Sequence, residues 1–254
     1  MMKNELEDLI LTLKKLRSPN GCDWDKSQTH KSLIPYLLEE TYEVIEAIQE
    51  NNMELLKEEL GDLLLHIIFQ AELASENNFF NIYDSINNIN EKLIKRHPYI
   101  FNHKNEMSHK KDNWELAKQK EKNRKSVLEG VPKILPALTR ARRIQEKAAG
   151  VGFDWNKLIQ VKNKIYEELN ELEEALETKD KDKIEDELGD VFFSLINLSR
   201  HINTDPEFAL NRSTNKFISR FHKIEGYMKE NNLKFDEQSL EDLDKIWKKI
   251  KLSD

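Results

Sequence analysis

The sequence predicts an all-α protein built from two tandem helical units. Charged residues make up 34% of the chain, and only 7 Gly and 6 Pro occur among 254 residues. This composition favours helices joined by short loops. Apolar residues recur at helical rather than alternating spacing. In addition, two acidic motifs occur twice at one interval, which indicates an internal repeat.

The repeat is clearest in those acidic motifs. The string Glu-Glu-x-x-Glu begins at Glu39 and again at Glu167, and Glu-x-x-Asp begins at Glu59 and again at Glu187, so that both pairs are 128 residues apart. The surrounding letters also match, EELGDLLLHI against DELGDVFFSL. Further along, the string NEKLIKR at residues 90–96 resembles TNKFISR at residues 214–220. The chain is therefore a duplication of one helical unit.

Apolar spacing and chain breaks locate the helices of the first unit. The break after the first helix contains Pro19 and Gly21. Pro35 falls in the first turn of the next helix, where proline is tolerated. We expect helices over residues 4–16, 33–50, 53–77 and 82–96.

After the first unit the composition becomes basic and poor in aliphatic residues. The stretch 102–125 predicts a solvated linker with one helix around Trp114; the alternative is a basic patch that attracts phosphates. A helix over 136–149, a glycine break and the Asp154-Trp155 pair then open the second unit. We therefore predict domains at 1–101 and 131–254 with a basic linker at 102–130.

Composition also excludes several classes of protein. The formal net charge of −7 gives no reason to expect a nucleic-acid partner. The N-terminus lacks the apolar core of a signal peptide, and no stretch approaches the roughly 20 apolar residues that span a bilayer. The single cysteine, Cys22, excludes an internal disulfide framework and a cysteine-rich zinc site. We expect a cytoplasmic protein without a membrane partner.

The acidic motifs predict a site for a hard divalent cation. Residues three or four apart on a helix share a face, so each motif presents its carboxylates as a group. Two such helices side by side would surround one point with oxygen ligands. The interval of 16 residues between Glu43 and Glu59 recurs between Glu171 and Glu187, which supports a paired-helix arrangement in each unit.

Asp62 and Asp190 lie among apolar residues, which predicts helices that are almost fully buried. A buried acid needs a charge partner, and a metal ion is a sufficient one; the alternative is local capping or pairing with lysine. The apolar neighbours expected to be buried are Leu60, Leu63, Leu64 and Ile67 in the first unit and Leu188, Val191, Phe192 and Leu195 in the second.

The chain resembles the MazG nucleoside triphosphate pyrophosphohydrolases in their two-domain bacterial form. The features that carry this resemblance are the two acidic motifs, the ELGD string, the preceding Asp-Trp segment and the later NKFISR segment. The resemblance covers nearly the whole chain. It implies tandem MazG-type helical units, usually assembled as homodimers. It also implies Mg²⁺-dependent hydrolysis of nucleoside triphosphates to nucleoside monophosphate and pyrophosphate, with Mn²⁺ as a substitute for Mg²⁺.

By motif position, the resemblance also implies particular site residues. The metal ligands are Glu168, Glu171, Glu187 and Asp190. The repeated acids of the first unit, Glu40, Glu43, Glu59 and Asp62, predict a second, weaker site. The predicted substrate contacts are Glu167, Glu168, Glu171, Lys183, Glu187, Lys216, Arg220 and the aromatic Trp247, and of these Lys216 and Arg220 also act in catalysis. Lys216 and Arg220 are four residues apart on one expected helix, as a phosphate clamp requires. Glu167, the remaining acid, is our candidate to orient or deprotonate the attacking water.

The two units are not equivalent. Lys183 corresponds to Leu55 in the first unit, whereas Lys92 and Arg96 keep the later basic pair there. Both units retain all the acids. We therefore expect the second unit to carry most of the activity.

Other readings of the motifs remain open. The chain is alternatively a non-catalytic, acidic helical protein with an interaction or regulatory role, or a pyrophosphatase specific for pyrimidine deoxynucleotides. A di-iron carboxylate bundle would require Glu-x-x-His at the acidic clusters, where none occurs. Trp24 and Trp155 either stack on a base or anchor their loops, and His66 is expected to line the bundle.

Overall fold

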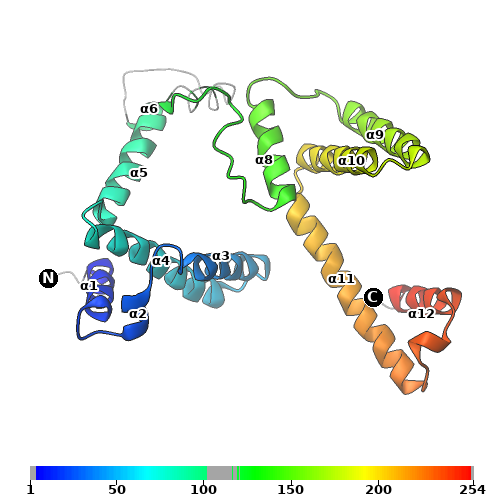
Figure 1. Ribbon diagram of the computed structural model, residues 1–254, viewed down its shortest axis with the longest axis horizontal. Helices are drawn as coiled ribbons and strands as arrows, with labels where there is room; N and C mark the ends of the chain where they lie inside the picture. Colours follow the sequence, from blue (N-terminus) through cyan, green and yellow to red (C-terminus); the bar gives the residue numbers. More distant parts are fainter. Residues whose placement is uncertain (1–3, 102–115, 117–118, 120, 253–254) are drawn as a thin grey trace. The chain divides into compact units, whose positions relative to one another are not determined.

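The computed structural model describes residues 4–101, 116, 119 and 121–252. The regular structure in these residues is entirely helical, which confirms the predicted all-α class (Figure 1). The chain divides into two compact units, Met1–Ser108 and His109–Asp254.

The first unit is organised around a pair of helices that lie side by side (Figure 1). A short turn connects them, and Asn52 caps the second by accepting a hydrogen bond from the Leu55 N–H at 3.2 Å. The paired helices are α3 (Ile34–Gln49) and α4 (Met53–Glu76), and the others are α1 (Glu5–Arg17), α2 (Asp23–Ser27), α5 (Ile82–Arg96) and α6 (Pro98–Phe101).

The core of the first unit lies around the C-terminal half of α4. Ile10 and Leu13 of α1 pack there against Ile68 and Phe69. The Arg17 guanidinium closes this contact with an ion pair to Glu76 at 2.6 Å. The N-terminal half of α4, which carries Glu59 and Asp62, therefore depends on α3 for its packing.

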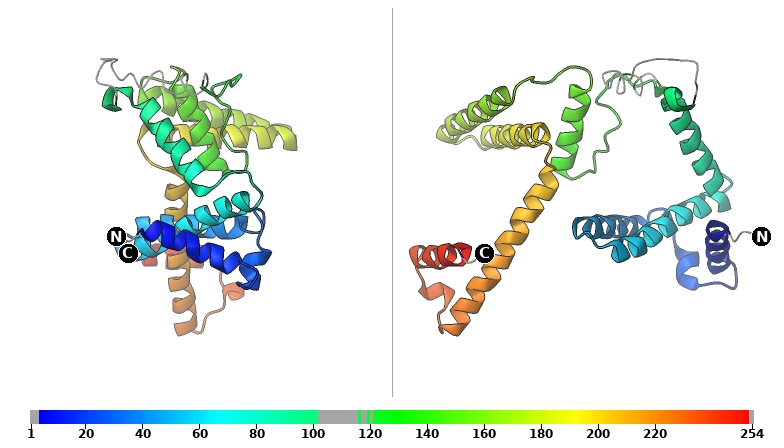
Figure 2. Two further views of the ribbon diagram at one scale, coloured as in Figure 1. Left: turned by 90° about the vertical axis from the view of Figure 1, so that its left-hand side faces the viewer. Right: turned by 180° about the vertical axis from the view of Figure 1, so that it is seen from behind.

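The second unit repeats the helix pair and adds a second small core. Helices α9 and α10 lie side by side, and α8 packs against α10 and α11 (Figure 2). At the C-terminal part of α11, Ile224 and Met228 pack against Ile250 of α12. The elements are α8 (Ala137–Ala149), α9 (Leu158–Thr178), α10 (Lys181–His201), α11 (Pro206–Glu230), the 3-10 helix η2 (Phe235–Glu237) and α12 (Leu240–Leu252).

The predicted burial of the acidic helices is wrong. Asp62 and Asp190 are exposed. Most of their apolar neighbours are also exposed, because a single neighbouring helix covers only one side of the acidic half of α4 or α10. The exposed fractions are Leu60 49%, Leu64 39%, Ile67 48%, Leu188 41%, Phe192 53% and Leu195 44%, whereas Val191 is buried.

The predicted helix around Trp114 and most of the predicted linker lie outside the described residues. In the part of the chain that is described, no helix is both long and apolar enough to cross a membrane.

Candidate metal centre

Three carboxylates converge in the second unit. Glu168 and Glu171 lie one turn apart on α9, and Glu187 faces them from α10. Each offers one oxygen such that all three oxygens lie within 4.8 Å of one another. Glu168 is almost completely buried, with 6% of its surface exposed. The fourth predicted ligand, Asp190, lines a cavity together with Glu168.

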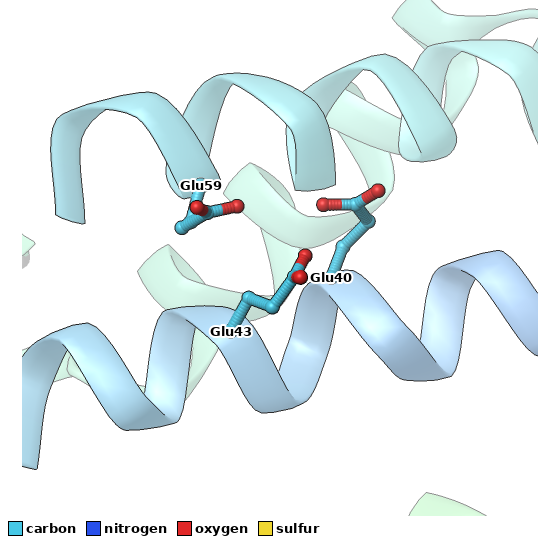
Figure 3. A group of neighbouring side chains, drawn as sticks. All are labelled: Glu40, Glu43 and Glu59. Atoms are coloured by element: carbon cyan, nitrogen blue, oxygen red, sulfur yellow. The ribbon is translucent and has the colours of Figure 1, made fainter. Parts of the chain in front are cut away.

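The first unit contains the same arrangement. Glu40 and Glu43 of α3 point toward Glu59 of α4, and their oxygens also lie within 4.8 Å of one another (Figure 3). Both copies thus bring together three of the four acids that the sequence predicts as ligands. Their binding of a metal stays a prediction.

The charge of these clusters is incompletely balanced. Burial, followed by repulsion from Glu43 and Asp62, raises the pKa of Glu40 to about 7. In the second unit a hydrogen bond with Glu168, followed by burial, raises the pKa of Glu171. A raised carboxyl pKa means that the ionised form lacks a sufficient positive partner. Several hard oxygen donors with excess negative charge fit a divalent cation such as Mg²⁺.

One basic residue of the site was missed by the sequence analysis. The Lys164 ammonium lies 2.6 Å from a Glu167 carboxylate oxygen and 2.8 Å from Glu168. These two hydrogen bonds raise the pKa of Lys164 above its usual range. Its spacing of four residues from Glu168 was the available signal, because such residues share a helix face.

At the corresponding position the first unit has an aromatic residue. Tyr36 stacks on His66 with ring centroids 6.3 Å apart. His66 Nε2 in turn lies 3.8 Å from Glu40. His66 is buried, as predicted for a histidine that lines the bundle. The first cluster therefore has an aromatic and imidazole environment where the second has an ammonium group.

The predicted basic and aromatic substrate contacts come from α10, α11 and α12. Lys183 is exposed in the first turn of α10. Lys216 and Arg220 lie on α11. The Arg220 guanidinium carbon is 5.8 Å from the ring centroid of Trp247, which belongs to α12. The structure thus groups Arg220 with Trp247, whereas the acids come from α9 and α10.

A cavity of about 570 Å³ adjoins the second acidic cluster. Lys164, Glu168 and Asp190 form part of its wall, and most of the rest comes from α8, the loop before α9 and α10. Arg200 anchors that loop, because its guanidinium donates to Asp154 at 2.7 Å. Trp155 of the loop lines the cavity.

Fold and site together define a class of protein: a tandem all-α chain in which each repeated helix pair gathers carboxylates suited to a divalent cation. The sequence model of the "MazG nucleotide pyrophosphohydrolase domain" matches residues 28–101 and 157–224. These two stretches contain both acidic helix pairs. The chain belongs to the MazG nucleotide pyrophosphohydrolase family, which confirms the resemblance.

Relatives that match over nearly their whole length agree with this assignment. The chain is 49% identical over 250 residues to the nucleoside triphosphate pyrophosphohydrolase/pyrophosphatase MazG of Thermotoga maritima, covering 98% of this chain and 96% of that protein. It is 39% identical over 256 residues to the nucleoside triphosphate pyrophosphohydrolase of Escherichia coli, covering 98% and 97%. It is also 40% identical over 257 residues to the uncharacterized protein YabN of Bacillus subtilis, covering 99% of this chain and 52% of YabN.

Proposed function

We propose that this chain hydrolyses nucleoside triphosphates to nucleoside monophosphate and pyrophosphate in a Mg²⁺-dependent reaction. Water attacks the α-phosphorus, and the bond from that phosphorus to the α–β bridging oxygen breaks. The observation that carries the proposal is the convergence of the Glu168, Glu171 and Glu187 oxygens within 4.8 Å in a member of this family. A broad role in clearing or controlling the nucleotide pool is the corresponding cellular function.

The acidic residues would hold the metal. Glu168, Glu171, Glu187 and Asp190 offer the hard oxygen donors that Mg²⁺ prefers, and Mn²⁺ accepts the same donors. When bound, Mg²⁺ supplies charge neutralisation and polarisation of the phosphate. Without it, a triphosphate of the same sign as the cluster would be repelled.

The chain's own cations would handle the remaining phosphate charge. Lys164 already lies among the acids and orients Glu167 and Glu168 through its two ion pairs. Lys183 lies in the first turn of the helix that carries Glu187. Lys216 and Arg220 would neutralise the departing pyrophosphate, and Arg220 would position Trp247 against the nucleotide.

Glu167 is our candidate to orient or deprotonate the attacking water. Its side chain is 56% exposed, and its carboxylate lies 2.6 Å from the Lys164 ammonium. An exposed acid that neighbours the metal ligands is available to accept a proton from water. Near-normal turnover by the Glu167→Gln variant at saturating Mg²⁺ would rule out Glu167 as the residue that activates the water.

The second unit would carry most of the activity. It has Lys164 and Lys183 beside its acids, whereas the first unit has Tyr36 and Leu55 at the corresponding positions. An acidic cluster without nearby lysines holds a triphosphate less firmly. The first cluster at Glu40, Glu43, Glu59 and Asp62 would be a weaker metal site or chiefly structural.

The active form would be a homodimer. The apolar residues of α4 and α10 are exposed in the single chain, among them Leu60 and Phe192. A second copy would bury these faces symmetrically. Light scattering at micromolar concentration should give twice the 30.1 kDa mass of the chain. A monomer under these conditions would count against the dimer.

A substrate panel tests the proposed function. Each NTP and dNTP is incubated with the protein, with and without Mg²⁺, and pyrophosphate release is measured. We expect pyrophosphate from several nucleotides only with Mg²⁺, and its loss in the Glu171→Gln variant. Turnover of pyrimidine deoxynucleotides alone would favour the specialist pyrophosphatase, and an absence of turnover would favour the interaction protein.

A further inference from the structure

His66 brings a nitrogen atom to the edge of the acidic cluster of the first unit. This residue of α4 is 8% exposed, and its Nε2 lies 3.8 Å from a Glu40 carboxylate oxygen. That distance is too long for a hydrogen bond. Among the described residues, neither ring nitrogen has a hydrogen-bond partner. A buried polar ring without such partners costs free energy, so its place beside three carboxylates calls for a partner outside the chain.

Nε2 is the nitrogen that such a partner can reach. The protein encloses Nδ1, whereas Nε2 is not enclosed in this way. Tyr36 stacks on the ring with the two planes within 10° of each other. This contact holds the imidazole in one orientation, and Nε2 therefore faces Glu40 in a fixed direction.

The separation between Nε2 and the Glu40 oxygen fits two ligands of one metal ion. Transition-metal ions such as Zn²⁺ lie about 2.0–2.2 Å from imidazole nitrogens and carboxylate oxygens, so two of their ligand atoms are about 3–4 Å apart. The Glu40 carboxylate also converges with Glu43 and Glu59. Asp62 lies four residues before His66 on α4 and shares its helix face. Further carboxylates are thus available to an ion held between Glu40 and His66.

The second unit offers no such nitrogen. Ser194 takes the place of His66, and its hydroxyl already donates to the Val191 carbonyl oxygen at 2.9 Å. Lys164, which takes the place of Tyr36, adds an ammonium group that repels a bound cation. Oxygen donors alone suit Mg²⁺, whereas a mixed set of imidazole and carboxylates suits a transition-metal ion. The two units therefore differ in the ion that their side chains favour.

We infer that the first unit binds a divalent transition-metal ion of the Zn²⁺ or Co²⁺ class through His66 Nε2 and Glu40, with Asp62 as a further carboxylate on the same helix face. The first cluster is then a weak site for Mg²⁺ but a selective site for a softer ion. The inference rests on the proposed use of the acidic clusters as metal sites, and it does not depend on hydrolysis at the second cluster.

Co²⁺ binding by a matched pair of variants tests the inference. Both variants are made in a Glu171→Gln background, because that change removes a proposed ligand of the second cluster. His66→Phe keeps an aromatic ring against Tyr36 but removes both nitrogens, and by calorimetry it should weaken Co²⁺ binding on the order of tenfold or more. The Mg²⁺ affinity should change less, because Mg²⁺ prefers oxygen ligands.

His222→Phe makes the same change at an exposed position on α11 and should keep the Co²⁺ affinity of the Glu171→Gln background. Equal Co²⁺ affinities of the His66→Phe and His222→Phe proteins would overturn the inference.

Proton NMR decides the question even if His66→Phe fails to fold. An imidazole bound to Co²⁺ gives a strongly shifted, exchangeable N–H resonance. We expect this resonance in the Glu171→Gln protein with one equivalent of Co²⁺, and we expect its loss when Glu40→Gln is added. Its absence from the first protein, or its persistence in the second, would overturn the inference. Pyrophosphate release by the wild type with Mg²⁺ is a separate measurement, and its failure would count against the proposed function alone.

Discussion

Lys164 holds the most buried acid of the candidate site, with its ammonium nitrogen 2.8 Å from a Glu168 carboxylate oxygen. The same ammonium binds Glu167 at 2.6 Å. In the absence of metal this lysine balances part of the charge of the cluster. A metal ion held by Glu168, as proposed, would compete with this lysine for the carboxylate. The first unit lacks such a residue, because Tyr36 takes its place.

Replacement of Lys164 should therefore lower the stability of the metal-free protein and increase the stabilisation that Mg²⁺ provides. Lys164→Met leaves Glu168 buried without its counter-ion, so the metal-free protein should lose on the order of 1–3 kcal/mol in the free energy of unfolding. Mg²⁺ should raise the melting temperature of this variant more than that of the wild type. Thermal melts with and without Mg²⁺ measure both effects. Lys162→Met, an exposed change on α9, is the control; an equal response of both variants to Mg²⁺ would contradict the competition.

The two acidic clusters should differ in their contribution to catalysis. Glu171→Ala should lower kcat/KM on the order of 10- to 100-fold, because it removes a predicted metal ligand. Glu43→Ala, the equivalent change in the first unit, should have a smaller effect. The two variants are assayed side by side for pyrophosphate release, with Glu173→Ala as a control on the same helix. A larger loss from the Glu43 change would reverse the assignment.

The raised pKa of Glu40 predicts a pH-dependent stability of the metal-free protein. The pKa of this carboxyl group is about 7 in the folded protein, above its usual 4.5. The group therefore stabilises the folded state at low pH, and this stabilisation is lost as the pH rises from about 4.5 to 7. Glu40→Gln cannot ionise, so it should be more stable than the wild type at pH 8, on the order of 2 kcal/mol, and close to it at pH 4.

Urea denaturation at the two pH values, with a chelator present, measures this difference. Glu46→Gln, an exposed acid on the same helix, is the control and should show no such pH dependence. An equal effect of Glu40→Gln at both pH values would refute the raised pKa that burial and the neighbouring acids give Glu40.

The pairing of Asp154 with Arg200 predicts a second pH effect of opposite sign. The Arg200 guanidinium holds the pKa of Asp154 below its usual value. This contribution is present above the unfolded pKa and is lost as the pH falls through the folded pKa. Asp154→Asn should destabilise the protein by about 1–3 kcal/mol at pH 7, and less at low pH. Denaturation of Asp236→Asn, an exposed control, should match the wild type.

Much of the fold was predictable because local signals were strong. The helix expected over 82–96 is α5 (Ile82–Arg96), whose start is fixed by the Asn81–Asp84 capping box. The helix expected over 53–77 is α4 (Met53–Glu76). The acidic clusters were also predictable, because their spacing and their repetition both depend on sequence alone.

The remaining features depend on tertiary packing. The exposed face of Phe192 could not be told from a buried one, because an apolar residue gives the same signal whether another helix or a second chain covers it. The hydrogen bond between Gln145 and Phe193 joins residues far apart in the sequence, so no local pattern predicts it. Lys164 could have been predicted, because it lies four residues before Glu168 and such residues share a helix face.

The most direct test of the account is hydrolysis of ATP with Mg²⁺ in ¹⁸O-labelled water. Mass spectrometry of the products locates the new oxygen. Attack at the α-phosphorus predicts one ¹⁸O in AMP and none in pyrophosphate, with both products lost in Glu171→Gln. Label in pyrophosphate, or formation of ADP and phosphate, would contradict the proposed reaction.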